Sequence, residues 1–302
     1  MRILLTGASG QVGGALLPLL QRRHTVFAPA SDKFDLSRPE TLPVQLEEMR
    51  PDLIVNPAAY TAVDRAEDEP DRAMLINSEA PGALARWSAA RHVPLVHLST
   101  DYVFDGSGDR AWREEDPTGP LSTYGRSKLA GERAVRDAGG AHLVVRTAWV
   151  YAAVGTNFMR TMIRLARERT SLRVVSDQCG TPTSAATIAA TLVDIIERNE
   201  GDMEAAFAAA KGLVHLTNCG ATTWHGFASA IVEGLQSRNV MLQAREVIPI
   251  ESKDYPTKAL RPANSKLDLA RLSKVYGVEP PPWQRALAEE LDAYVALVSP
   301  RT

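Results

Sequence analysis

A glycine-rich turn near the start of the chain constrains the fold more than any other feature. The apolar residues 3–6 predict a short strand, and helical spacing of apolar residues begins at Gln11. Residues 7–13 read Gly-Ala-Ser-Gly-Gln-Val-Gly. Glycines allow a tight turn and let a pyrophosphate approach the backbone, while a helix N-terminus offers free N–H groups and a positive dipole end. This context favours a dinucleotide-binding turn over a purely structural one.

Short apolar strands alternate with longer helical patterns through the first half of the chain. That order is typical of right-handed βαβ units and a parallel sheet. We therefore predict an α/β protein with a doubly wound parallel sheet of the Rossmann type. The predicted strands are residues 3–6, 25–28, 53–56, 95–99, 143–146 and 214–216. The predicted helices are residues 11–21, 40–49, 71–91, 122–137, 157–169, 184–198, 205–210, 224–237 and 283–298.

The order of elements becomes less regular after Trp149, and a proline-rich stretch covers residues 249–262. These features predict a smaller α/β lobe, interleaved with the first domain. The predicted dinucleotide-binding domain comprises residues 1–150 and 176–218, and the predicted substrate lobe comprises residues 151–175 and 219–302.

Charge and composition exclude several classes of partner. The formal net charge is -2, which gives no electrostatic reason to expect nucleic acid or an anionic membrane. No apolar stretch reaches the ~18 residues of a membrane span, and the chain enters a strand at once, without a cleavable leader. Cys179 and Cys219 form no disulfide framework or zinc motif. We expect a cytoplasmic protein.

Tyr124 and Lys128 form a possible proton-donating pair. A gap of four residues on a helix stacks two side chains on one face. A free phenol has a pKa of about 10, and a neighbouring ammonium lowers that pKa by favouring the phenolate. Tyrosine four residues before lysine is also common on solvated helix faces, so the spacing alone leaves both interpretations open.

Two further strand ends carry residues suited to a ligand, because ligands of open α/β sheets bind at the carboxyl edge. Small residues, Ala58 and Ala59, follow the strand 53–56 and could let a cofactor lie against the backbone, or could simply pack tightly. Ser99 and Thr100 end the next strand. Thr100 could bind a substrate oxygen, and both hydroxyls could equally cap the strand end.

The end of the second strand bears on the choice of cofactor. An acidic residue there would hold the ribose 2′-hydroxyl of NADH and repel a 2′-phosphate. Residues 28–31 read Ala-Pro-Ala-Ser instead, with Lys33 nearby. This favours NADPH and leaves NADH as an alternative. Asp35 could contact the adenine amino group or could be a capping or surface residue.

The glycine turn, the strand ends and the Tyr-x-x-x-Lys helix together resemble the extended short-chain dehydrogenase/reductase family. Over nearly the whole chain the resemblance narrows to the dTDP-4-dehydrorhamnose reductases. The segments that carry it are residues 10–13, 61–64, 99–104, 124–128, 146–151, 180–183 and 261–265.

The resemblance implies a reaction and a site. Tyr124 would protonate the carbonyl oxygen at sugar C4 as hydride arrives from NADPH, Lys128 would lower the tyrosine pKa and hold the nicotinamide ribose, and Thr100 would bind the same oxygen. The substrate would be a dTDP-linked 4-dehydro-6-deoxysugar. The implied cofactor residues are Gly7, Ser9, Gly10, Gln11, Val12, Asp35, Leu36, Ala58, Ala59, Tyr60, Ser99, Tyr124 and Lys128. The implied substrate residues are Val63, Thr100, Asp101, Tyr102, Trp149, Arg261 and Asn264, with core packing as the alternative for Trp149.

The sequence departs from the resembled family at its metal site. Some bacterial members bridge a dimer through Mg²⁺ held by glutamates, but here the first two places are Ala15 and Ala186, and only Glu290 remains. A hard dication such as Mg²⁺ requires several oxygen ligands. We predict no metal site and a monomer or weak homodimer. His97 is expected in the core, and the acidic run 67–69 is expected to be a solvated helix end.

Two other functions stay open. One is a related nucleotide-deoxysugar enzyme, such as a 4-ketoreductase of different stereochemistry. A dehydratase is disfavoured because Asp101 is followed by Tyr102 rather than by glutamate. The other is a non-catalytic regulatory subunit of the methionine adenosyltransferase type, against which the intact Thr100, Tyr124 and Lys128 weigh.

Overall fold

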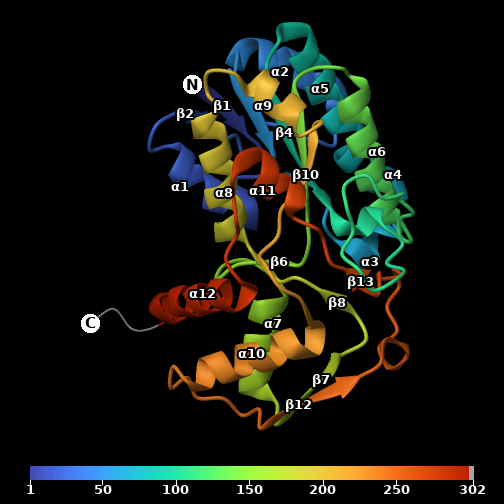
Figure 1. Ribbon diagram of the computed structural model, residues 1–302, viewed down its shortest axis with the longest axis vertical. Coiled ribbons are helices and arrows are strands. Elements are labelled where there is room, and N and C mark those ends of the chain that lie inside the picture. The colour runs from blue at the N-terminus through green and yellow to red at the C-terminus, as the bar shows by residue number, and fades with distance from the viewer. Residues whose placement is uncertain (299–302) are drawn as a thin grey trace.

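The computed structural model describes residues 1–298, and its larger part is built on a six-stranded parallel sheet (Figure 1). The strand order is β10-β5-β4-β3-β1-β2. The strands are β1 (Arg2–Leu5), β2 (Thr25–Phe27), β3 (Leu53–Asn56), β4 (Leu95–Thr100), β5 (His142–Thr147) and β10 (Leu213–His215). The predicted α/β fold with a doubly wound parallel sheet is confirmed.

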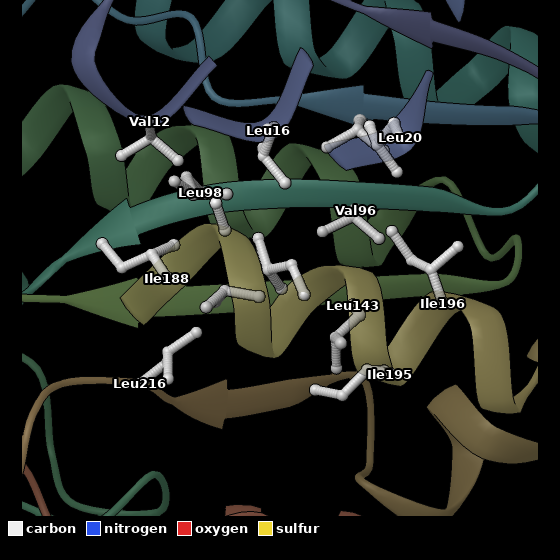
Figure 2. Close-up of a cluster of buried hydrophobic side chains, with 14 of the residues drawn as sticks. Val12, Leu16, Leu20, Val96, Leu98, Leu143, Ile188, Ile195, Ile196 and Leu216 are labelled. Carbon is white, nitrogen blue, oxygen red and sulfur yellow. The ribbon is translucent and has the colours of Figure 1, made fainter. Parts of the chain in front are cut away.

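Helices cover both faces of this sheet, so alternate residues of each strand enter two different cores. Ile3 and Leu5 belong to the cluster with α1 and α8, while Leu4 belongs to the cluster with α2 and α5. Figure 2 shows the first cluster, with Leu16 of α1 and Ile188 of α8 on the same side of the sheet. The helices of this part are α1 (Gln11–Leu20), α2 (Leu42–Met49), α3 (Val63–Ala66), α4 (Pro70–Met74), α5 (Ala80–Arg91), α6 (Thr123–Asp137), α8 (Ala185–Arg198), α9 (Met203–Ala209) and α11 (Ala270–Tyr276). Short helical turns are η1 (Pro39–Thr41), η2 (Leu75–Glu79) and η3 (Asp101–Val103).

The single helix predicted for residues 71–91 was wrong. The structure has α4, then a π-helical turn η2, then α5. Pro81 has no N–H to donate to the Asn77 carbonyl one turn earlier, and its ring would press on that carbonyl. The wider turn relieves both problems. It also frees the Asn77 side chain, whose Nδ2 donates to the Tyr60 carbonyl and to Ser127 Oγ, both at 3.0 Å.

A smaller lobe packs around its own apolar cluster, in the lower half of Figure 1. Its elements are α7 (Phe158–Glu168), α10 (Trp224–Gln236), α12 (Trp283–Val298), η4 (Ser252–Asp254) and the parallel pair β7 (Ser171–Val175) and β12 (Glu246–Ile250). Two-residue strands link segments far apart in sequence: β6 (Val150–Tyr151), β8 (Cys179–Gly180), β9 (Thr183–Ser184), β11 (Thr222–Thr223) and β13 (Asn264–Ser265). The exact division of the chain into two domains stays a prediction, and residues 299–302 of the predicted lobe lie outside the described residues.

The sheet has one topological switch point. The chain runs from β1 outward to β2 and then crosses back to β3 on the other side of β1. Ligands of open α/β sheets bind outside the carboxyl ends of the strands at such a reversal. The turn after β1 and the loop after β3 therefore open onto the same crevice. Within residues 1–298, no helix is long and apolar enough to cross a bilayer.

Candidate active site

The turn after β1 is so tight that two of its positions require glycine. Gly7 has a φ of +58°, in the left-handed region that disfavours other residues. A Cβ on Gly13 would lie 2.1 Å from the Gly7 carbonyl oxygen, and a Cβ on Gly7 would lie 2.9 Å from Ala58 Cα. The loop that carries Ala58 therefore packs directly on the turn, as a backbone cradle for phosphates requires.

The other predicted cofactor residues surround this cradle in different roles. Ser9 and Gly10 are exposed at the start of α1, whereas Val12 and Leu36 are buried in the core. Gln11 Oε1 accepts a hydrogen bond from Asn157 Nδ2 at 2.9 Å, which ties the turn to the smaller lobe.

Asp35 and Tyr60 use their side chains within the protein. The Asp35 carboxylate accepts from the backbone N–H of Ser37 at 2.8 Å and from its hydroxyl at 2.7 Å, and these bonds hold the pKa of Asp35 below its usual value. The Asp35 carboxylate thus stabilises a local turn, and its contact with the adenine amino group stays a prediction. The Tyr60 hydroxyl donates to Glu69 at 3.1 Å.

Tyr124 and Lys128 lie one turn apart at the start of α6, as predicted. Ser122 caps this helix by accepting from the Gly125 N–H at 3.1 Å. The half-buried Tyr124 ring packs edge-on against Tyr102, with ring centroids 5.5 Å apart. Lys128 is only 2% exposed, and its Nζ donates to the Leu98 carbonyl at 2.6 Å.

The expected lowering of the Tyr124 pKa by Lys128 was wrong for this geometry. Burial raises the pKa of Tyr124, Asp101 raises it further, and a hydrogen bond with Thr100 acts in the opposite direction. Burial also lowers the pKa of the Lys128 ammonium to about 8, against the attraction of Glu132. Desolvation outweighs pairing here because the ammonium is directed at the Leu98 carbonyl rather than at the phenol.

Thr100 ends β4 and Asp101 begins the turn η3, directly beside Tyr124. The Thr100 hydroxyl accepts from the Tyr102 N–H at 3.2 Å and donates to Asp101 Oδ1 at 3.0 Å, so it caps the turn η3. Asp101 is 2% exposed, and burial raises its pKa to about 6. The structure therefore brings Thr100, Asp101, Tyr102 and Tyr124 together at one strand end.

The acidic run that follows β3 is not the solvated helix end expected from the sequence. Glu67 accepts from both the backbone N–H and the hydroxyl of Thr123 at 2.7 Å, and so holds the first turn of α6. Asp68 pairs with Lys258. Glu67 and Asp68 thus face partners that lie far away in sequence, which local charge patterning cannot reveal, whereas Glu69 pairs with its neighbours Arg65 and Arg72.

Residues 257–263, here called the strap, cross from the smaller lobe to α3. Arg261 Nη2 lies 2.7 Å from Asp64 Oδ2, and Asp64 Oδ1 accepts from the Ala259 N–H at 3.0 Å. Val63 begins the same helix and is half-buried. The strap thus brings Arg261 to the predicted substrate residues near the switch point.

A cavity of about 1620 Å³ opens beside the strap in the smaller lobe. Aromatic side chains, Phe158 and Trp224, form part of its wall, and Arg164, Arg173 and Arg261 are among its cationic residues. Asn264 does not present its side chain to a ligand in this way. Its Nδ2 donates to the Arg110 carbonyl at 2.7 Å and its Oδ1 accepts from the Lys266 N–H.

The family model described as the RmlD substrate binding domain matches residues 1–296. The chain belongs to this family. A dTDP-4-dehydrorhamnose reductase from Burkholderia thailandensis is 45% identical over 289 residues, which cover 95% of this chain and 97% of that relative.

Solved structures agree with the RmlD assignment. A dTDP-4-dehydrorhamnose reductase from Clostridium acetobutylicum is 33% identical with a TM-score of 0.88, covering 97% of this chain and 99% of that one. Another from Bacillus anthracis, in complex with NADP, is 31% identical with a TM-score of 0.87 and the same coverage. This RmlD-family chain is an oxidoreductase of the extended short-chain dehydrogenase/reductase type.

Glu290, the only glutamate at the three positions considered for a metal site, has a structural partner. Glu290 is 8% exposed, and its Oε2 accepts from the Ala153 N–H at 2.6 Å. Burial raises the pKa of Glu290. Among residues 1–298, no group of three or more His, Cys, Asp or Glu side chains could hold a metal ion.

Sequence reasoning missed a buried ion pair beneath the site of this RmlD-family chain. Arg146 makes two hydrogen bonds to Glu132, at 2.8 and 2.7 Å, and the Ser99 hydroxyl donates to Glu132 Oε1 at 2.5 Å. Glu132 follows Lys128 by four residues on α6, and that spacing was the available signal. His97 is fully buried, as predicted, with Nδ1 3.0 Å from Asn56 Nδ2.

Proposed function

We propose that this enzyme reduces dTDP-4-dehydro-6-deoxy-L-mannose at C4 to give dTDP-L-rhamnose, the last step of dTDP-rhamnose synthesis, with NADPH as the reductant. The observation that carries the proposal is a grouped Thr100, Tyr124 and Lys128 at the switch point of a chain that matches dTDP-4-dehydrorhamnose reductases from end to end.

The residues around the glycine turn fit NADPH. A Cβ at Gly7 or Gly13 would collide with Ala58 or with the Gly7 carbonyl, so only glycine allows the tight turn that presents backbone N–H groups to phosphates. No acid stands at residues 28–31, directly after β2, and the exposed Lys33 and Arg38 lie a few residues further along, interspersed with Asp32 and Asp35. The end of β2 therefore lacks an acid that would repel a 2′-phosphate. We propose residues 1–150 and 176–218 as the cofactor-binding part.

Bound NADPH supplies the hydride that reaches C4. Tyr124 donates its phenolic proton to the C4 oxygen as negative charge develops there, and the Thr100 hydroxyl, turned away from Asp101 Oδ1, donates a second hydrogen bond to the same oxygen. The raised pKa of Tyr124 keeps the phenol protonated at neutral pH, as a proton donor must be. Lys128 holds the ribose. Once the site is filled, the positive charge of Lys128 also stabilises the phenolate that forms when Tyr124 gives up its proton.

The cavity beside the strap suits the nucleotide half of the substrate. The Phe158 ring offers an apolar contact to a base, and the Arg261 guanidinium N–H groups that do not bind Asp64 can donate to a phosphate. Val63, Asp101, Tyr102 and Trp149 would then surround the sugar. Asn264 contributes by holding the loop at Arg110.

A product-identified assay tests the proposal. The purified chain receives dTDP-4-dehydro-6-deoxy-L-mannose with NADPH or NADH, cofactor oxidation is followed by absorbance, and the sugar is identified by NMR. We expect dTDP-L-rhamnose, formed faster with NADPH. A talose-configured product would instead assign the related ketoreductase, and cofactor binding without turnover would favour a regulatory role.

Assembly and location follow from the same proposal. Ala15 and Ala186 remove two carboxylates from a bridging metal site, so we propose a monomer or weak homodimer that does not depend on Mg²⁺. Sedimentation with EDTA and with Mg²⁺ should give the same mass. Because nucleotide sugars and NADPH are cytoplasmic metabolites, we propose the cytoplasm as its compartment.

A further inference from the structure

Trp149 holds an unfavourable backbone conformation between β5 and β6. Its φ is +50°, in the left-handed region that bulky L residues rarely adopt. Such a conformation persists only where the surroundings over-determine it, and it is enriched at ligand sites. The Trp149 carbonyl is fixed by accepting from the Thr183 N–H at 3.1 Å. The question is what fixes the indole.

Trp224 covers one face of the Trp149 indole. The two rings are stacked, with centroids 3.5 Å apart and an interplanar angle of 10°. Phe158 supports Trp224 in turn, at a centroid distance of 4.5 Å. Trp224 is the first residue of α10, whose N-cap Thr223 accepts from the Gly226 N–H at 3.0 Å. The stacking partner thus stands on a capped helix end.

Gly180 covers the opposite face. A Cβ on Gly180 would lie 2.5 Å from Trp149 Cε2, 2.8 Å from Cζ2 and 2.9 Å from Nε1. An approach in the ring plane would bring Cζ2 or Nε1 closer than Cε2, so Gly180 lies over the ring face. Two groups cannot share a face at these distances, which places Gly180 opposite Trp224.

The sandwich leaves only the rim of the indole free. Trp149 is half-buried, and its Nε1–H donates no hydrogen bond within residues 1–298. Nε1 is not among the buried unpartnered polar atoms of these residues, so it is accessible from outside the slot. The free donor at the rim therefore suits a hydroxyl or phosphate oxygen of a ligand, whereas stacking of a sugar on either face is blocked.

We propose that Trp224 is the positioning residue for Trp149: with Gly180 it forms a slot that aims the Trp149 N–H edge at the sugar nucleotide. The inference rests on the proposed function, in which Trp149 contacts the substrate. Trp224 also lines the cavity beside the strap, whereas Trp149 does not. The slot therefore joins the sugar end of the site to the nucleotide cavity.

Circular dichroism tests the slot without any substrate, because two stacked indoles give an exciton couplet. The wild-type chain should show the couplet, and Trp224→Leu should lose it. Trp87→Phe is the matched control, since Trp87 packs in a remote core and donates to Glu47. No couplet in the wild type, or one that survives in Trp224→Leu, would overturn the proposal.

Kinetics test the positioning role. In Trp224→Leu we expect KM for the sugar nucleotide to rise about tenfold, the loss of one well-placed hydrogen bond. We expect kcat and KM for NADPH to change less than about threefold, because neither the acid nor the cofactor cradle is touched. Trp224→Phe keeps a stacking face and should restore KM to within about threefold of wild type.

Gly180→Ala is a second route to the same disturbance, since its Cβ would push the indole from the other face. It should raise KM while Trp224 is intact. Unchanged KM in Trp224→Leu with a lost couplet would show that Trp224 positions nothing. Failure of the proposed function is seen separately, as a wild type that neither turns over the substrate nor binds dTDP-L-rhamnose in calorimetry; the slot proposal then falls with it.

Discussion

The catalytic edge and the substrate face of this enzyme are built in different ways. The catalytic edge (Thr100, Tyr124 and Lys128) stands on β4 and α6, and neighbouring polar atoms are paired inside the core. The substrate face, formed by the strap and the indole slot, depends on two ion pairs at the surface, one aromatic stack and two-residue strands. The difference predicts that changes at the edge reduce kcat, whereas changes at the face raise KM.

Removal of the proton donor should give the largest effect. Tyr124→Phe should reduce kcat by about 10³-fold, because general acid catalysis acts in the chemical step. NADPH affinity, measured by fluorescence titration, should stay within about threefold of the wild-type value, because the substitution removes only a hydroxyl group at the reacting end of the site. Activity equal to wild type would remove Tyr124 from the catalytic edge.

The cofactor cradle should come next. A Cβ in Gly13→Ala meets the Gly7 carbonyl at 2.1 Å, and we expect the Kd of NADPH to rise by about 10- to 100-fold. Gly14→Ala is the matched control on the same helix, because its Cβ would lie 3.3 Å from the nearest atom and the position is exposed. Equal effects from both variants would contradict a specific cradle.

The catalytic edge should also show a pH dependence of its own. The pKa of Lys128 is lowered to about 8, so its charge is lost as pH rises through that value, while Tyr124, with its raised pKa, stays protonated. We expect kcat/KM to be level below about pH 8 and to fall about tenfold per pH unit above it. Lys128→Arg should move this fall in kcat/KM to higher pH. If the fall begins at the same pH in that variant, the group that titrates is not Lys128.

The smallest expected effect comes from the contact that joins the two regions. Glu67→Gln weakens the anchoring of the first turn of α6, and we expect kcat to fall about fivefold, the worth of a typical helix cap. Asp68→Asn, next to it, removes an exposed ion pair and should change kcat by less than about twofold. Similar losses in both variants would indicate a general effect of charge.

The catalytic edge could be predicted from the sequence because its determinants are local. The glycine turn lies between adjacent elements, and Tyr124 and Lys128 share one helix face. The shift in the Tyr124 pKa could not be predicted from this spacing. Burial raises that pKa instead of lowering it, and burial depends on the whole fold. The Pro81 signal was local too, but its consequence, a π-helical turn, was overlooked.

The substrate face resisted prediction because its contacts are long-range. Glu67 and Thr123 are separated by 56 positions, and Asp64 and Arg261 by 197. Two-residue strands such as β8 and β11 carry no periodicity, so nothing near Gly180 or Trp224 indicates that they enclose Trp149. Only the folded chain brings these residues together.

The most direct test of the account follows the hydride itself. The enzyme is supplied with dTDP-4-dehydro-6-deoxy-L-mannose and NADPH that carries deuterium at the transferred position of the nicotinamide, and the product is examined by NMR. The account predicts dTDP-L-rhamnose with deuterium at C4, and almost none formed by Tyr124→Phe. Deuterium at another carbon, or an unlabelled product, would contradict it.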